Sequence, residues 1–248
     1  MPMFSFSISA KAITASFRVP ETHTFHQTLP LPPKTAIVGM IGAALGLRLD
    51  DAHRFVEQNN ILVSVYGTHK GLMKDLWNYR KLTSKEKKFT PEDVKNRMQY
   101  SILIREFLFS NEFTFYFASD KSDPLAKLIK AFSSPAYALT AGNSDDLLKI
   151  CSISEIIEIK SEKTIRFENT IIPGDISKAC KHIIDFKQTP ITETLYTPQV
   201  FLLPTRFEFH GEERRVIERK PFTFISTPVT LSNPLDGYCI DGKAVVFQ

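Results

Sequence analysis

Two histidines, His23 and His26, stand close together near the start of the chain, and Tyr79 and Lys81 follow later. Side chains of these types can cleave RNA without a metal ion. Histidine acts as a general base on a ribose 2′-hydroxyl, lysine stabilises the charged transition state, and tyrosine orients the reacting groups. A catalytic site also requires that its residues meet, which this spacing does not show. We therefore expect binding rather than catalysis, with a metal-independent endoribonuclease as the alternative.

The segment from residue 68 to residue 99 mixes basic and aromatic side chains and has no sustained apolar period. Trp77, Tyr79, Arg80 and Lys81 lie in its middle. Such a mixture can bind single-stranded RNA, because the cations pair with phosphates while the rings stack on bases. The alternative is a solvated surface loop. The sequence therefore predicts an insertion here, either exposed to solvent or in contact with RNA.

A helix start lies directly after the proline-rich segment 29–33. Each proline fixes its own φ angle and moves the preceding residue out of the helical region, so this segment must be extended. A helix can begin only afterwards, which places Lys34 and Thr35 in its first turn. Unpaired N–H groups and the positive end of the helix dipole favour an anion there, such as a phosphate. The pattern G-x-x-x-x-G-K-[ST] is absent, which excludes a nucleotide-binding P-loop.

Small residues recur along this helix at three- and four-residue spacing, namely Gly39, Gly42, Ala43 and Gly46. A glycine within a helix costs up to about 1 kcal/mol, so this pattern indicates the close approach of another backbone. We expect that backbone to belong to a β-sheet packed against the helix. A nucleic-acid backbone in the same place is the alternative.

Arg105 and Glu106 interrupt an otherwise apolar run over residues 100–109. Adjacent residues of a strand point to opposite faces, so the two charges do not face each other. Each charge must face solvent, pair with a partner or face a ligand. We expect solvent exposure for both.

Periodicity and turn signals predict the elements that position these residues. Apolar and polar residues alternate over 3–13, which predicts a half-buried strand. Ser110-Asn111 predicts a hairpin turn between two strands, and Asp123-Pro124 predicts the start of a helix. The expected helices begin at residues 34, 50 and 123, and the expected strands cover 3–13, 61–66, 100–109, 112–118, 150–160, 200–210, 215–226 and 243–247.

The order of these features resembles a known family. An N-terminal strand, then Ser16-Phe17-Arg18 with Pro20, then the run from Pro32 to Gly46 is similar to the CRISPR-associated Cas-five family, within the repeat-associated RNA-binding (RAMP) superfamily. The resemblance implies an α+β fold with a ferredoxin-like (RRM-like) βαββαβ core. It places that core in residues 1–160, with a basic hairpin or thumb inserted at about 68–99, before a small β-rich C-terminal region in 161–248.

The resemblance also implies a function. Most members are non-catalytic subunits of type I Cascade surveillance complexes that cap the 5′ handle of the CRISPR RNA (crRNA) and contact the backbone and large subunits in antiviral defence. Target DNA is recognised indirectly, through base pairing with the guide. One branch of the family processes the precursor RNA. The RNA contacts that the resemblance and the residue types suggest are Arg18, His23, Lys34, Thr35, Gly39, Trp77, Tyr79, Arg80, Lys81 and Arg105.

Composition restricts the remaining possibilities. The chain has 248 residues, 43% of them hydrophobic, which indicates a globular protein. No apolar run is long enough to cross a bilayer and the N-terminal segment lacks a basic start, so we expect no membrane association and a cytoplasmic location. The three cysteines lack zinc-site spacing, and we expect no metal and no cofactor. Because the net charge is only +4, a purely structural subunit-docking protein is a further alternative.

Overall fold

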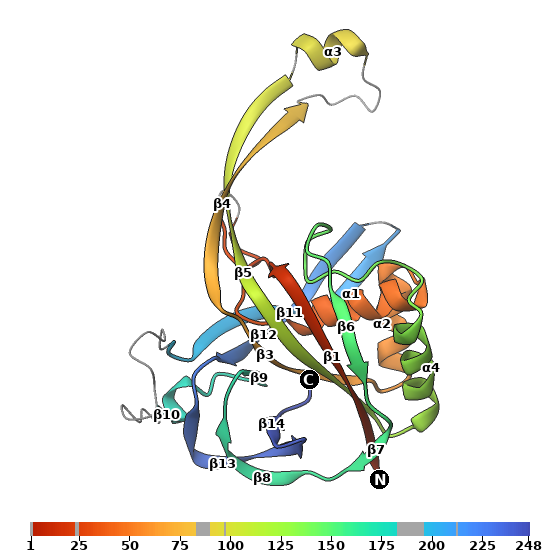
Figure 1. The fold of residues 1–248 in the computed structure, drawn as a ribbon, viewed down its shortest axis with the longest axis vertical. Helices are drawn as coiled ribbons and strands as arrows, with labels where there is room; N and C mark the ends of the chain where they lie inside the picture. Colours follow the sequence, from red (N-terminus) through yellow and green to blue (C-terminus); the bar gives the residue numbers. More distant parts are fainter. Residues whose placement is uncertain (1, 23–24, 83–89, 97, 183–195, 212) are drawn as a thin grey trace.

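The chain forms an α+β fold built on mostly antiparallel sheets, shown in Figure 1. This computed structural model describes residues 2–22, 25–82, 90–96, 98–182, 196–211 and 213–248. None of the helices within these ranges is long and apolar enough to span a membrane. The helices are α1 (Lys34–Leu45), α2 (Leu49–Gln58), α3 (Pro91–Asn96) and α4 (Ser122–Ser133), with a 3-10 turn η1 (Ser177–Ala179). The strands are β1 (Met3–Ala15), β2 (Phe25–His26), β3 (Leu62–Thr68), β4 (Gly71–Leu82), β5 (Met98–Ser119), β6 (Lys149–Ile153), β7 (Ile157–Ile159), β8 (Glu162–Phe167), β9 (Thr170–Pro173), β10 (Cys180–His182), β11 (Gln199–His210), β12 (Glu213–Ile225), β13 (Val229–Ile240) and β14 (Lys243–Val245).

Four strands form the centre of the large sheet, in the order β3-β5-β1-β6. Along the chain, α1 and α2 connect β1 to β3, and α4 connects β5 to β6. All three pairings among the four strands are antiparallel. The alternation predicted for β1 is confirmed, because Phe6 and Ile8 are buried in the main core whereas Lys11 is exposed.

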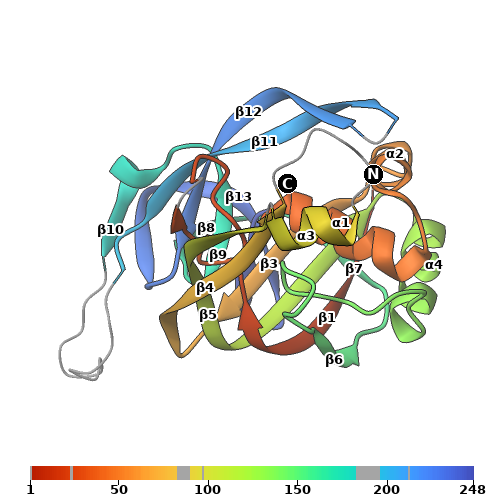
Figure 2. The same ribbon diagram turned by 90° about the horizontal axis from the view of Figure 1, so that it is seen from above.

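Helices α1, α2 and α4 cover one face of this sheet (Figure 2). Phe117 of β5 lies in the core beneath them, with its ring 5.0 Å from that of Phe6 and 5.3 Å from that of Phe132. The neighbouring residue Tyr116 points to the opposite face, where it packs with Ile240 and Val245 near the C-terminus. Both faces of β5 are therefore buried at this point.

The C-terminal region extends the same sheet. Strands β9, β12 and β11 continue it beyond β3, and Ile171, Phe222 and Phe224 join the main core. The hairpin predicted between residues 200 and 226 is confirmed as β11 and β12, and Gly211 at its end has a φ of 63°. A smaller sheet of β10, β13 and β14, with β8, lies below (Figure 1). The C-terminal region thus adds three strands to the large sheet and residues to the main core, and it also forms a second sheet and a core cluster of its own.

The turn predicted at Ser110-Asn111 is wrong, because β5 continues through both residues. Ser110 has the positive φ of a turn residue, 54°, but the chain does not reverse. The side-chain amide of Asn111 donates hydrogen bonds to the carbonyls of Ala12 at 3.3 Å and Leu108 at 3.0 Å. Pairing with β1 on both sides of this point keeps the strand in register, so the local turn preference produces only an irregularity.

In the segment 68–99, where a hairpin or thumb insertion was expected, the structure forms a long hairpin. Strand β4 pairs residue by residue with the first half of β5, from Gly71 opposite Phe109 to Leu82 opposite Met98. The two strands project from the body as a long hairpin with α3 at its tip (Figure 1). A hairpin that leaves the body has no single buried face, so its sequence lacks the period of a half-buried strand. The lysines at 85, 87 and 88 lie outside the described residues.

The glycine-patterned helix packs differently from the expectation. A Cβ atom on Gly42 would lie 3.0 Å from the Cβ atom of Ala52 in α2, so the close neighbour there is a helix rather than a sheet. Gly46 ends α1 in the left-handed region, with a φ of 70°. A Cβ atom on Gly39 would have no neighbouring atom within 4 Å. Packing therefore explains Gly42 and helix termination explains Gly46, whereas Gly39 borders open space.

Candidate nucleic-acid interface

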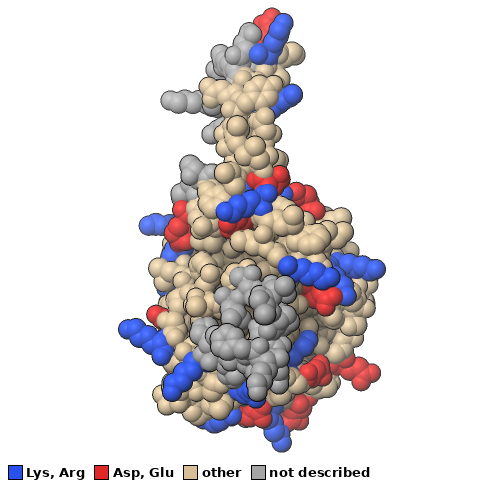
Figure 3. Space-filling model, turned by 60° about the vertical axis from the view of Figure 1, so that its left-hand side comes forward, with Lys and Arg blue, Asp and Glu red and all other residues tan. Residues whose placement is uncertain are grey.

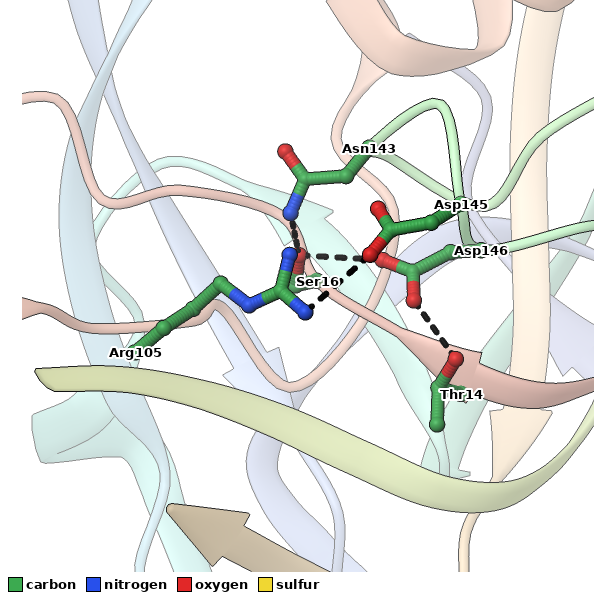
Figure 4. Close-up of polar contacts among 6 residues, drawn as sticks. All are labelled: Thr14, Ser16, Arg105, Asn143, Asp145 and Asp146. Atoms are coloured by element: carbon green, nitrogen blue, oxygen red, sulfur yellow. Dashed lines mark hydrogen bonds and ion pairs between the residues drawn. The ribbon is translucent and has the colours of Figure 1, made fainter. Parts of the chain in front are cut away.

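A buried polar cluster holds the loop that follows β1 (Figure 4). Asp146 is only 1% exposed, and its carboxylate accepts hydrogen bonds from Thr14 Oγ1 at 2.6 Å and Ser16 Oγ at 3.1 Å. Asn143 donates to the same Ser16 hydroxyl at 2.5 Å. A Cβ atom on Gly142 would lie 1.8 Å from the Ser16 carbonyl oxygen, so only glycine fits this approach. These contacts fix the start of the loop against residues 140–148.

The predicted helix start is confirmed. Pro33 is extended, with φ −70° and ψ 163°, and α1 begins at Lys34. The amides of Ala36 and Ile37 bond to the Pro33 carbonyl at 2.9 and 3.2 Å. The first turn of α1 and the positive end of its dipole therefore lie beside Thr35.

A cleft of about 510 Å³ opens at this helix start and is lined by Thr35 and three arginines. Arg18 comes from the loop after β1, whereas Arg214 and Arg219 come from β12. Leu203 and Phe207 of β11 supply part of the apolar lining. The tertiary fold thus brings cations from both ends of the chain to the start of α1.

The three arginines are partly held in place. Arg18 donates from Nε and Nη2 to the Thr22 carbonyl at 3.1 and 2.8 Å, which stabilises its own loop. Arg219 Nη1 lies 3.1 Å from Glu21 Oε1, and the guanidinium of Arg214 lies 4.7 Å from the ring centre of Phe207. Among the described residues, Glu21 is the one carboxylate in an ion pair with these arginines. The cleft therefore keeps an excess of positive charge.

Further cations lie beside the cleft. Burial lowers the pKa of the Lys34 ammonium, and nearby Lys220 lowers it further, although Glu57 acts in the opposite direction. Burial also lowers the pKa of the His53 imidazole in α2, and the charge of Arg214 adds to that effect. A bound anion would stabilise the charged form of the Lys34 ammonium.

Arg105 and Glu106, which were expected to be exposed, are both largely buried, with side chains 12% and 10% exposed. Arg105 Nη2 lies 3.3 Å from Asp145 Oδ2, and its guanidinium lies 5.0 Å from the ring centre of Trp77. The hydrogen bond from Arg105 lowers the pKa of Asp145. The expectation of solvent exposure was wrong because β4 and the loop over 140–148 pack against β5. Neither contact could be predicted from the sequence of β5 itself.

The projecting hairpin carries accessible rings and cations. The guanidinium of Arg80 lies 5.6 Å from the ring centre of Tyr100, which stands directly opposite in the strand register. Tyr100 is 65% exposed and Trp77 is 47% exposed. In Figure 3 the shaft of the hairpin is mostly uncharged, with charged side chains at its base and tip. This surface can stack on bases or pack against a partner protein.

The backbone separates the residues considered for cleavage. His26 of β2 pairs with Arg105 of β5. Tyr79 and Lys81 lie in β4 four and six residues beyond the partner of Arg105, or about 13 and about 20 Å along the strand. His23 lies outside the described residues. The backbone therefore holds these residues at different points along the hairpin.

Several residues that line the cleft or lie beside it were missed in the sequence. Arg214, Arg219 and Lys220 follow Arg18 at great distance along the chain, and His53 shows no local signal. The basic pairs at 214–215 and 219–220, within a predicted hairpin, were the one available indication. Within the described ranges, no group of three or more His, Cys, Asp or Glu side chains could hold a metal ion.

Comparisons with known proteins give a family and a shared fold. The model of a family described as CRISPR-associated protein (Cas_Cas5) matches residues 11–185. A chain of a "CRISPR RNA-guided surveillance complex" has a TM-score of 0.53 at 15% identity, with 91% of each chain covered. A CRISPR protein from Archaeoglobus fulgidus has a TM-score of 0.48 at 9% identity, with 97% of this chain and 98% of that chain covered. A comparison with curated protein sequences finds no match. The first structure supports a shared fold, and the family match covers most of the chain.

Proposed function

The chain belongs to the CRISPR-associated Cas5 family, and from that premise we propose that it is a non-catalytic subunit of a type I CRISPR surveillance complex that binds the 5′ handle of the crRNA. The observation that carries the proposal is the cleft at the start of α1, where Arg18, Arg214 and Arg219 meet the positive end of the helix. Arginine side chains and first-turn amides bind phosphate oxygens by charge-assisted hydrogen bonds. A phosphate of the handle therefore fits this cleft.

The surface of α1 extends the proposed contact. Thr35 lines the cleft, and Gly39 lies one helical turn later on the same face. Because the space beside Gly39 is open, an RNA backbone can approach the helix backbone there. We assign the handle to a path from the arginine cleft along this face of α1.

The remaining elements suggest the other contacts. The order β3-β5-β1-β6 with α1 and α4 is that of a ferredoxin-like βαββαβ unit, so we infer such a core. The β4–β5 hairpin is then the thumb, whose exposed Trp77 and Tyr100 would contact RNA or the backbone subunit of the complex. The body would contact the large subunit. Target DNA would be recognised through base pairing with the guide.

A pair of adjacent substitutions tests the cleft. Arg214 lines it, whereas its neighbour Arg215 does not, and consecutive strand residues point to opposite faces. Arg214→Glu should weaken binding of labelled 5′-handle RNA about tenfold or more and reduce the salt dependence of binding by roughly one phosphate contact. Arg215→Glu changes the net charge equally and should have a much smaller effect. Equal losses for both variants would contradict a phosphate site in the cleft.

The same experiment, done in EDTA, distinguishes the alternative functions. RNA cleavage that is lost on changing His23 and His26 to alanine would identify a processing ribonuclease. No salt-sensitive binding of handle RNA by the wild type would favour a purely structural docking subunit. Binding without cleavage is the expected result.

A further inference from the structure

A second pocket, of about 350 Å³, lies where the β4–β5 hairpin meets the body. Leu72, Leu108 and Phe201 give it apolar walls, and Glu106 and His69 are among its polar groups. This combination of apolar walls and a few polar groups is typical of a pocket for a small ligand. None of the residues predicted from the sequence to bind RNA lines it.

This pocket adjoins the arginine cleft. Arg18 and Pro20 line the cleft, whereas Val19 between them lines the pocket. Thr28, which is bridged to Arg18, also lines the pocket. A nucleotide whose phosphate lies in the cleft therefore has its neighbours within reach of the pocket.

Glu106 determines which chemical group the pocket accepts. Among the described residues, its carboxylate has two long contacts, with Oε2 3.4 Å from the Thr28 amide nitrogen and Oε1 3.9 Å from Lys74 Nζ. A carboxylate that is 10% exposed and weakly paired requires further N–H donors. A carboxylate also disfavours a phosphate, so the group that binds here must carry N–H donors and no negative charge.

His69 supplies a second polar group at the pocket. Its Nδ1 atom is buried and makes no hydrogen bond with any described residue. The His69 ring lies 6.4 Å from that of Tyr196, centre to centre, at an angle of 56°. Burial lowers the pKa of His69, so its ring is neutral at neutral pH and can both accept and donate a hydrogen bond. Aromatic rings of this kind stack on unpaired bases.

We propose that this pocket binds a guanine base of the RNA, with its N1–H and N2–H groups donating to the two carboxylate oxygens of Glu106. Guanine is the RNA base whose Watson–Crick edge presents two adjacent donors, whereas adenine presents one donor beside an acceptor. The apolar walls from Leu72, Leu108 and Phe201 would cover the faces of the base. This inference rests on the proposed function and adds a base preference to it.

Short oligoadenosine RNAs with and without a single central guanosine test the preference. Wild-type protein should bind the guanosine-containing RNA about tenfold more tightly, as a bidentate base contact provides. Glu106→Gln keeps the side-chain volume but converts the two acceptors into one acceptor and one donor, which matches adenine. The variant should therefore lose the preference for guanosine or reverse it. Glu112→Gln, an exposed position on the same strand and outside the pocket, is the matched control.

Each outcome decides the inference. Equal binding of the two RNAs by the wild type would overturn it, as would an equal loss of affinity for both RNAs in Glu106→Gln. If Glu106→Gln unfolds, Leu72→Trp, which fills the pocket, should abolish the preference and leave binding of oligoadenosine unchanged. If the wild type binds neither of these RNAs nor the handle RNA, the proposed function fails. In that case saturation-transfer NMR with guanosine monophosphate and adenosine monophosphate tests whether the pocket binds guanine. The absence of a signal for guanosine monophosphate would overturn the inference.

Discussion

Gly39 and Gly42 of α1 have different surroundings, and a methyl group added at each should have opposite effects. The space beside Gly39 is open, so Gly39→Ala should raise the free energy of unfolding by up to about 1 kcal/mol through better helix propensity. Gly42→Ala would place its Cβ atom 3.0 Å from that of Ala52 and should destabilise the fold. Urea unfolding of both variants measures this difference.

RNA binding by the same variants tests the proposed path along α1. Gly39→Ala should weaken binding of handle RNA although it stabilises the protein, because the added methyl group occupies the space assigned to the RNA backbone. Arg215→Glu serves again as a control for non-specific effects. If Gly39→Ala binds the RNA as tightly as the wild type, the path does not pass over this residue.

The β4–β5 hairpin depends on contacts across its own two strands, because its shaft leaves the body. Trp77 carries the guanidinium of Arg105 on its ring and stands opposite Leu103, which is only 7% exposed. Trp77→Ala should remove both contacts and accelerate amide hydrogen exchange in β4 and the first half of β5. Exchange measured by mass spectrometry should show no comparable change in β1.

Leu76 offers a matched control for this element. It precedes Trp77 on the opposite face of the hairpin and is 64% exposed, so Leu76→Ala removes little buried surface. Its hydrogen exchange should resemble that of the wild type. Equal acceleration in both variants would mean that strand propensity, rather than the stack of Trp77 on Arg105, holds the shaft.

The pH dependence of the stability of the whole molecule should reflect two partly buried histidines. The pKa values of His53 and His69 are lowered from the ordinary 6.5, in both cases mainly by burial. Between each lowered pKa and 6.5, the unfolded chain binds more protons than the folded one. Above pH 6.5 the two histidines are neutral in both states and do not change the free energy of unfolding. As the pH falls below 6.5, proton uptake by the unfolded chain should decrease the free energy of unfolding.

Urea unfolding between about pH 5 and about pH 7.5 measures this effect. His53→Gln and His69→Gln should each reduce the pH dependence, because glutamine does not titrate. Leu76→Ala, which removes an exposed side chain that does not titrate, provides the control and should keep the pH dependence of the wild type. A wild-type stability that does not change over this range would contradict the partly buried, neutral state of both histidines.

Local sequence patterns were sufficient for the features that short-range sterics control. The prolines of segment 29–33 determine where α1 can begin, and alternation determined the buried face of β1. The same reasoning failed at Ser110-Asn111, where turn preference was overridden by pairing with β1 on both sides. It also failed for Arg105, because the residues that bury it come from other parts of the chain.

By itself, the sequence determined the family resemblance, the α+β class, the start of α1 and the presence of Arg18, Lys34 and Thr35 beside it. Only the tertiary structure brought Arg214 of β12 to the same cleft and placed Glu106 in a pocket. The physical reason is the distance along the chain between the residues that interact. Helix starts and strand faces depend on neighbouring residues, whereas the cleft and the pocket depend on which distant strands pair within one sheet, and packing of the shared core decides that pairing.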